Sequence, residues 1–257
     1  MSISIRERLR ARQAVIGGMV SLSSPALVEG IGYSGLDFVI IDTEHGPADT
    51  ESAENLLRAA KAGGTVPFVR VPAAQRDLIS RAMDSGAAGV MVPQINSLAD
   101  LSLAVNAMRF PPQGTRGLAP TVRAARYGFL PLEEFLAWTN EETLLIAQIE
   151  SRDAVGNLPG LLRTGKIDIA FIGPMDLSQS LGVPGLVSHD SVQTAIEDIL
   201  QICRECNVVA GSVARDANGV AEWVRRGCSF VALTSTLPFR VYRDCIDQAR
   251  LLLGKLG

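Results

Sequence analysis

The chain has 257 residues, of which 47% are hydrophobic and 20% charged, and its formal net charge is −3. This composition excludes an intrinsically disordered chain and argues against nucleic-acid binding, which usually requires a basic excess or a basic face. No apolar run approaches the roughly 20 residues that cross a bilayer, and Met1–Arg12 lacks the apolar centre of a signal peptide, so we expect a cytoplasmic protein without membrane or nucleic-acid partners.

Short apolar runs alternate with longer amphipathic stretches along the chain. Near-continuous apolar runs of this length are typical of strands buried on both faces of a parallel sheet. We predict eight strands, at Ala14–Val20, Phe38–Ile41, Val66–Val69, Gly89–Val92, Leu144–Ile149, Ile167–Ile172, Asn207–Ala210 and Phe230–Leu233. The clearest predicted helices between them are Ala53–Ala62, Arg76–Ser85, Leu98–Met108, Val192–Arg204 and Asn218–Arg226.

Eight strand–helix units in a chain of this length predict an α/β protein with a single (β/α)₈ TIM barrel. The main alternative is a doubly wound open sheet, which usually has fewer strands and needs a switch point. No linker or low-complexity tract interrupts the chain, so we expect one domain over residues 1–257. The widest gap between strands, Arg109–Asn140, is long enough to suggest a functional loop.

Two short motifs are better explained by structure than by chemistry. Gly30–Gly35 satisfies G-x-G-x-x-G, but a helical pattern precedes it and a strand follows it, the reverse of the dinucleotide-binding order. We expect these glycines to turn the chain from helix into strand. Cys203 and Cys206 form a lone C-x-x-C without a second pair or a nearby histidine, which favours two small apolar helix residues.

The active site of a (β/α)₈ barrel lies at the carboxyl ends of its strands. The polar residues that follow the predicted strands are therefore candidates for the site: Asp42, Thr43, Glu44, His45, Arg70, Gln94, Gln148, Glu150 and Asp176.

Glu150 and Asp176 end neighbouring strands, where two carboxylates can share a hard divalent cation; the alternative is a pair of solvated loop acids or helix caps. His45 has acids beside it and is a candidate general base, although a lone histidine is more often structural. Arg70 follows a buried strand and must pair with an anion, either a protein carboxylate or a substrate. Asp84 lies in a helical pattern, where position alone indicates a surface acid.

Lysine is scarce: Lys61, Lys166 and Lys255 are the only three in the chain. None of them follows a predicted strand, so none is expected at the catalytic mouth. A Schiff-base aldolase requires a lysine there. Electrophilic catalysis is therefore expected to come from a metal ion.

Five ordered motifs resemble the HpcH/HpaI aldolase/citrate lyase family of class II, metal-dependent pyruvate aldolases in the phosphoenolpyruvate/pyruvate-barrel superfamily. The resemblance extends from about Ile16 to beyond Phe230. The set is far more specific than any single motif, and comprises Ile40–Pro47 (IIDTEHGP), Phe68–Pro72 (FVRVP), Gly89–Gln94 (GVMVPQ), Gln148–Glu150 (QIE) and Phe171–Ser178 (FIGPMDLS).

The resemblance implies roles for the residues in these motifs. Glu150 and Asp176 would hold Mg²⁺ or Mn²⁺, with Co²⁺ or Zn²⁺ as alternatives, and pyruvate would chelate the cation. The amides of Met175 and Asp176 would receive the pyruvate carboxylate. The remaining assignments are enolate stabilisation by Arg70, base catalysis by His45, orientation of that base by Asp84 and Asp42, and a supporting position for Gln148.

The implied reaction is reversible cleavage of a 4-hydroxy-2-oxo acid to pyruvate and an aldehyde, as in aromatic or sugar acid catabolism. The family also implies a homohexamer, a trimer of dimers, in which the C-terminal helix Tyr242–Leu253 packs on a neighbour. Two departures, Thr234–Thr236 and Thr43, border the region expected to receive the aldehyde. The loop carrying Arg123 and Arg126 is expected either to hold a distal carboxylate or to line a subunit interface.

Two other functions compete with the aldolase. A malyl- or citryl-CoA-type lyase would use the same site, but it needs a basic groove for the CoA phosphates, which a lysine-poor chain does not favour. A barrel without activity would serve as a binding or assembly module, which the presence of base, arginine and both acids argues against.

Overall fold

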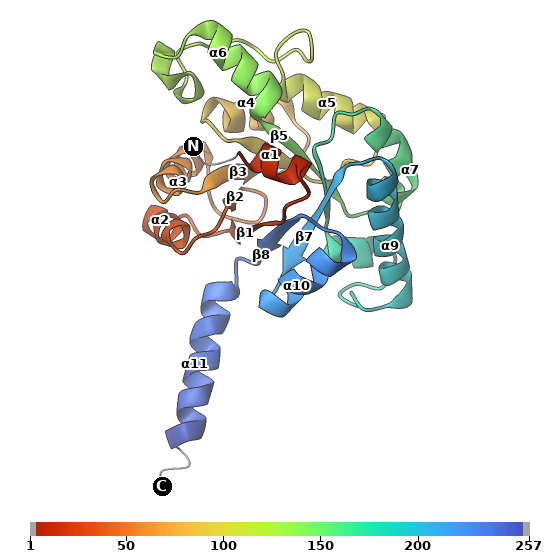
Figure 1. Cartoon of the computed structure of the whole chain (residues 1–257). Helices are drawn as coiled ribbons and strands as arrows, with labels where there is room; N and C mark the ends of the chain where they lie inside the picture. The colour runs from red at the N-terminus through yellow and green to blue at the C-terminus, as the bar shows by residue number, and fades with distance from the viewer. Residues whose placement is uncertain (1–3, 254–257) are drawn as a thin grey trace.

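Eight parallel strands form a closed barrel in the computed structural model, which describes residues 4–253, with helices around the outside (Figure 1). The strands pair in chain order and β8 closes on β1. The predicted TIM barrel is therefore confirmed and the open sheet is excluded. The strands are β1 (Val15–Val20), β2 (Phe38–Asp42), β3 (Val66–Arg70), β4 (Gly89–Val92), β5 (Leu144–Ile149), β6 (Ile169–Ile172), β7 (Val209–Ala214) and β8 (Phe230–Leu233).

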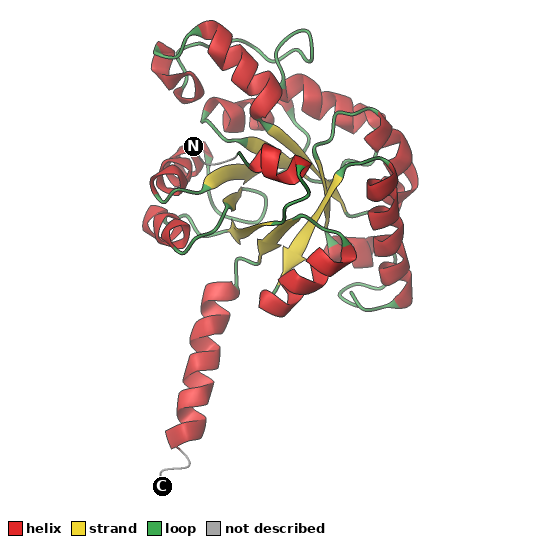
Figure 2. Cartoon of the chain, in the orientation of Figure 1, coloured by secondary structure: helices red, strands yellow, loops and turns green. Residues whose placement is uncertain are grey.

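Helices connect successive strands and cover the barrel (Figure 2). Several begin at a side-chain cap, as at Asp49, Ser97 and Ser151. The helices are α1 (Ile5–Arg10), α2 (Pro25–Tyr33), α3 (Thr50–Ala62), α4 (Arg76–Asp84), α5 (Leu98–Met108), α6 (Leu132–Ala137), α7 (Arg152–Arg163), α8 (Pro174–Ser180), α9 (Asp190–Glu205), α10 (Ala217–Arg226) and α11 (Leu237–Leu253), with short η1 (Arg123–Gly128) and η2 (Trp138–Glu142).

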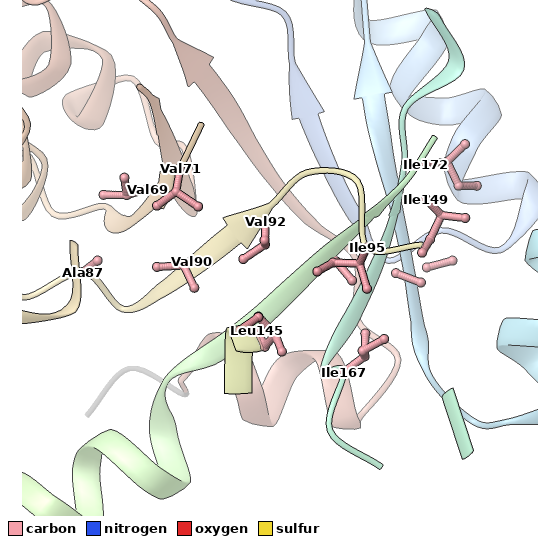
Figure 3. Packing of buried hydrophobic residues seen from close by; sticks show 14 of the residues in the cluster. Val69, Val71, Ala87, Val90, Val92, Ile95, Leu145, Ile149, Ile167 and Ile172 are labelled. Carbon is pink, nitrogen blue, oxygen red and sulfur yellow. The ribbon is translucent and has the colours of Figure 1, made fainter. Parts of the chain in front are cut away.

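Strand residues alternate between the barrel interior and the helix-facing side, as the two-residue period of a strand requires. Outward residues pack against the helices in one large apolar cluster; Figure 3 shows part of it, including Val69, Val90, Leu145 and Ile172. Inward residues form a second cluster that fills the barrel. Continuing the inward series of a strand to its carboxyl end therefore identifies the side chains that reach the mouth of the barrel.

Four phenylalanines form an aromatic layer across the barrel interior; Phe38 and Phe230 begin β2 and β8, whereas Phe171 lies near the end of β6. The rings of Phe38 and Phe230 stack at 3.9 Å between centroids, and Phe68 meets both edge-on. Phe171 contacts Phe230 at 6.3 Å. A Cβ at Gly17 would come within 2.3 Å of the Phe38 ring, so this strand position admits only glycine. The layer gives the barrel a rigid apolar interior below its mouth.

The Gly30–Gly35 motif and strand β7 differ from the sequence expectations. Gly30 and Gly32 lie inside α2, and only Gly35, at φ +94°, makes the turn into the strand. Gly32 packs directly on the backbone of Gly63, where a Cβ would approach within 2.7 Å. Strand β7 starts later than predicted, because Asn207 adopts a left-handed conformation, and continues through Gly211 to Ala214.

The long β4–β5 connection is structured rather than an open loop. It contains η1, α6 and η2 and packs around its own small cluster of Phe110, Ala125 and Phe135.

Helix α11 extends away from the barrel (Figure 1), and none of its residues is buried. Within residues 4–253, no helix is both long and apolar enough to span a membrane.

Candidate active site

A cavity of about 290 Å³ opens at the carboxyl ends of the strands, above the aromatic layer. Most of its walls are the inward side chains that the alternation brings to this end. Its lining residues are Met19, Ser21, Asp42, His45, Arg70, Gln148, Phe171, Gly173, Pro174, Met175, Asp176, Val213, Thr234 and Ser235.

Arg70 and Asp42 are the final residues of neighbouring strands β3 and β2 and face each other in register. The guanidinium donates from Nε to Oδ1 at 2.9 Å and from Nη2 to Oδ2 at 2.7 Å, the bidentate arrangement that fixes an arginine most firmly. Burial opposes ionisation of Asp42, but the bonds from Arg70 and from two backbone amides outweigh it and hold its pKa below the ordinary value. The sequence left open whether Arg70 pairs with a protein carboxylate or with a substrate; the structure shows the pair with the carboxylate of Asp42.

Glu44, one of the acids expected beside His45, belongs to the same cluster. Its Oε2 lies 3.2 Å from Nη1 of Arg70 and 4.0 Å from Nε2 of His45. Burial raises the pKa of Glu44, while the charge of Arg70 partly offsets that rise. Glu44 thus links the arginine to the histidine, and its position two residues beyond the end of β2 was the only signal in the sequence.

The His45 side chain is 67% exposed and lines the cavity. Asp42 accepts hydrogen bonds from the backbone amides of Glu44 and His45, at 3.1 and 3.2 Å, and not from the imidazole. The expectation that Asp42 orients the ring is therefore wrong in its geometry. Asp42 shapes the turn that carries His45, and the acid nearest the ring is Glu44.

Asp84 does not join the site within one chain. It is the last residue of α4, at the opposite end of the barrel from the cavity, and pairs with Arg116. The Arg116 side chain has no exposed surface and also lies over the Phe110 ring, 4.8 Å from its centroid. Within one subunit Asp84 therefore cannot orient His45, the role that the resemblance implied. A helix that precedes a strand ends near the amino end of that strand, whereas His45 lies at the carboxyl ends of the strands.

Glu150 lies directly behind the cavity wall and is only 6% exposed. Its Oε1 accepts from the amide of Gln94 at 2.9 Å, and its Oε2 accepts from Nε2 of Gln148 at 2.8 Å. Gln94 adopts φ +52°, an unusual conformation for a side-chain-bearing residue, and this aims its amide at the carboxylate. The structure therefore assigns the backbone of Gln94, rather than its side chain, to the site.

Burial raises the pKa of Glu150 to about 7. The hydrogen bond from the Gln94 amide lowers this pKa, and the negative charges of Asp176 and Glu44 raise it. Asp176 is in the first turn of α8 and is exposed toward the cavity. Two carboxylates that repel each other are a favourable environment for a divalent cation.

The surroundings of the two acids also fit a hard cation that retains water. Oε1 of Gln148 is buried and has no hydrogen-bond partner, so it is available to a ligand or a metal-bound water. A Cβ at Gly173 would come within 2.9 Å of Oε2 of Glu150, so the missing side chain keeps the carboxylate in place. In the described part of the chain, no cluster of three or more acid, histidine or cysteine groups exists, so water and substrate would complete the coordination.

The far wall of the cavity carries no charge. Met19 comes from β1 and Val213 from β7; Ser21 directly follows β1, and Thr234 and Ser235 follow β8. The expectation that Thr43 borders the same region is wrong: its hydroxyl donates to the carbonyl of Arg70 at 2.7 Å, and its side chain lies outside the barrel between α3 and α4.

Lys61 and Lys166 precede β3 and β6, at the end of the barrel away from this cavity, and Lys255 lies outside the described residues. In the described part of the chain, the strand ends of the closed barrel present two acids, a fixed arginine and a histidine but no lysine, which fits the class of TIM-barrel enzyme that uses a cation rather than a Schiff base.

Comparison with known proteins agrees with that class. Residues 16–239 match the model of the HpcH/HpaI aldolase/citrate lyase family, and the chain belongs to this family. The chain is 33% identical to the 2-keto-3-deoxy-L-rhamnonate aldolase of Escherichia coli over 258 positions, which cover 100% of this chain and 95% of that protein.

Two solved structures are also similar. An HpcH/HpaI aldolase/citrate lyase family protein from Burkholderia cenocepacia superposes with a TM-score of 0.90 at 32% identity, covering 96% of this chain and 98% of the other. The citrate synthase SbnG superposes with a TM-score of 0.85 at 30% identity, covering 99% and 98%.

Proposed function

We propose that this protein is a metal-dependent aldolase that cleaves a 4-hydroxy-2-oxo acid to pyruvate and an aldehyde, and catalyses the reverse addition. The observation that carries this proposal is the placement of Arg70 and the Glu150–Asp176 pair on one side of the cavity and an uncharged wall on the other. A keto acid needs cationic groups at one end, and a neutral aldehyde needs none. Family membership supports the aldolase class.

Glu150 and Asp176 would hold a divalent cation, Mg²⁺ or Mn²⁺, which supplies Lewis-acid stabilisation of negative charge on the substrate. Arg70, fixed by Asp42, would direct its remaining N–H groups at the 2-keto oxygen. The amides of Met175 and Asp176 lie in the first turn of α8, where backbone N–H groups lack helical partners, and would bind the substrate carboxylate. Gln148 would hold Glu150 in position.

In the cleavage direction, a base removes the proton of the 4-hydroxyl and the oxygen forms the aldehyde carbonyl as the C3–C4 bond breaks. The electron pair of that bond becomes the C2–C3 double bond of an enolate, and the keto carbonyl pair moves onto its oxygen. The aldehyde leaves and the resulting enolate takes up a proton at C3 to give pyruvate. His45 would exchange these protons, directly or through water, because its ring is exposed to the cavity. Preorganised positive charge at the keto oxygen is the main source of rate enhancement in such a reaction.

We propose a 2-keto-3-deoxy sugar acid as the substrate. The relative from Escherichia coli is named for such a compound, 2-keto-3-deoxy-L-rhamnonate. In this chain Ser21, Thr234 and Ser235 offer hydroxyl groups to the far end of the cavity, while Met19 and Val213 offer apolar contact. This lining suits a neutral hydroxyaldehyde better than one that carries a second carboxylate.

Proton exchange tests the first half of the reaction without knowledge of the aldehyde. Pyruvate is incubated with the protein in D₂O, with Mn²⁺ or with EDTA, and its methyl signal is followed by NMR. We expect deuterium incorporation that requires both the metal and Arg70. Absence of exchange with metal, or cleavage of malyl- or citryl-CoA thioesters while keto acids remain inert, would contradict the proposal.

We also propose that the 257-residue chain acts as one domain within a homo-oligomer, a hexamer of three dimers. Helix α11 exposes Phe239, Tyr242 and Ile246 by 57, 72 and 49%. An apolar cavity of about 540 Å³ lies beside its base, between α2, β1 and the segment after β8. The α11 helix of a second copy would cover apolar surface that one subunit leaves exposed.

A further inference from the structure

A second cavity, of about 550 Å³, lies at the opposite end of the barrel from the candidate active site. The ends of α3 and α4 form one side of it, and the β4–β5 connection forms the other. Its lining residues are Lys61, Gly86, Arg123, Ala124, Arg126, Tyr127, Leu130, Glu134 and Trp138.

Three cations face this cavity, and Glu134 is the single acid among its lining residues. Within residues 4–253, no carboxylate forms an ion pair with Lys61, Arg123 or Arg126. Burial lowers the pKa of Lys61, and the positive charges of Arg123 and Arg126 lower it further. Three positive charges around a cavity, with Glu134 as the one acid in its lining and Glu54 near Arg123, leave an excess of positive charge that favours the binding of an anion.

The backbone around the cavity positions Arg123 and places Arg126 in a constrained turn. Gly86 has φ +84°, and a Cβ there would come within 2.9 Å of Nη1 of Arg123, which donates to the carbonyl of Ser85. Arg126 and Tyr127 both adopt left-handed conformations, at φ 50° and 57°. The Tyr127 hydroxyl accepts from Arg58 at 3.0 Å, which ties this strained turn to α3.

We propose that this cationic pocket, formed by Lys61, Arg123 and Arg126, binds a small oxyanion with two or more negative charges, of the phosphate or polycarboxylate class. The cavity is large enough for an organic anion, and Leu130 and Trp138 supply apolar wall beside the charges. The site is independent of the proposed aldolase reaction, because none of its lining residues lines the cavity at the strand carboxyl ends.

Calorimetry at constant ionic strength and in EDTA tests the proposal with phosphate, citrate and acetate as probes. The variant K61Q/R126Q removes two charges from the pocket and leaves Arg123, whose bond to Ser85 supports the fold. The variant R163Q/K166Q removes one arginine and one lysine from exposed positions at the end of α7 and serves as the matched control. Phosphate and citrate distinguish an inorganic from an organic ligand.

We expect phosphate or citrate, but not acetate, to bind the wild type and the control with equal affinity. We expect at least tenfold weaker binding to K61Q/R126Q. Glu150→Gln, which disables the proposed metal site, should leave the anion affinity unchanged, so failure of the aldolase proposal does not affect this result. Equal affinity in K61Q/R126Q, or no binding by the wild type because a second copy fills the pocket, would overturn the proposal.

Discussion

Arg70 and Asp42 end adjacent strands and are joined by two hydrogen bonds, of 2.9 and 2.7 Å, inside a wall where both side chains are almost fully buried. The pair occupies the last inward position of each strand, directly above Phe68 and Ile40. Arg70 is therefore positioned by the sheet itself before any substrate binds. Preorganisation of this kind is what stabilisation of a developing enolate requires.

Replacing Asp42 by Asn tests this positioning. Asn keeps one acceptor but loses the charge and the second parallel bond, so we expect kcat for aldol cleavage to fall by about 10²-fold, or about 2.7 kcal/mol. The affinity for Mn²⁺ should change little, because Asp42 does not contact Glu150. Steady-state kinetics and Mn²⁺ titration of the same preparation separate these effects; a loss of metal binding with intact kcat would contradict the assignment.

Gly173→Ala tests the close packing of the residue between β6 and α8 against Glu150. The added methyl would meet Oε2 of the carboxylate at 2.9 Å, whereas the φ of −101° at this residue permits alanine. We expect weaker Mn²⁺ binding without backbone strain, measured by calorimetry. Gly156→Ala in α7 is the control: its Cβ meets nothing within 4 Å, so it should retain metal affinity and gain about 0.5–1 kcal/mol of stability.

The metal-free protein should become less stable as the pH rises through the titration of Glu150. Burial raises its folded pKa to about 7 from 4.5, so the folded chain keeps a proton that the unfolded chain loses. Its stabilising contribution is complete below about pH 4.5 and is lost as the pH approaches and passes 7. The 2.5-unit difference corresponds to about 3 kcal/mol.

Urea unfolding in EDTA at pH 5 and pH 8 measures this contribution, with Glu150→Gln as the reference. Between pH 5 and pH 8, the free energy of unfolding of the wild type should fall by about 2–3 kcal/mol more than that of the variant. Mn²⁺ should restore the wild type and not the variant. An identical pH dependence in the two proteins would show that Glu150 titrates normally.

Helix α11 provides a test of assembly. Ile246→Asp puts a charge on the apolar face that we propose a second copy covers, so light scattering should detect smaller species than the wild type forms. Gln248→Asp, two residues along and on another side of the helix, is the control and should leave the mass unchanged. A monomeric wild type, or an unchanged mass for Ile246→Asp, would contradict the proposed interface.

Much of the fold could be predicted from the sequence because parallel strands buried on both faces leave a continuous apolar signal. Helix α5 and strands β4, β5 and β8 have the predicted bounds. Strand β7 was harder, because Gly211 and Ser212 interrupt its apolar run where the chain packs closely on Phe230. Likewise, Gly32 of α2 is needed for close contact with Gly63 at the end of α3, and the order of residues in the sequence does not reveal this contact.

The candidate site could be located from strand ends, but not its internal connections. Sequence position brings Asp42, Arg70, Gln148 and Asp176 to the cavity, as the structure does. It does not show that Asp42 binds Arg70 rather than the His45 ring, nor that Thr43 points outward. The amide of Gln94 and the role of Glu44 depend on the conformation of loops, whose course is set by tertiary contacts rather than by a repeating pattern.

The central claim is that Glu150 and Asp176 together bind a divalent cation to which the keto acid is delivered. Anomalous diffraction from a crystal grown with Mn²⁺ and pyruvate tests this directly. The account predicts one strong manganese peak per chain within coordination distance of both carboxylates, with pyruvate density between that peak and Arg70. Two carboxylates turned apart, with no manganese peak between them, would contradict it.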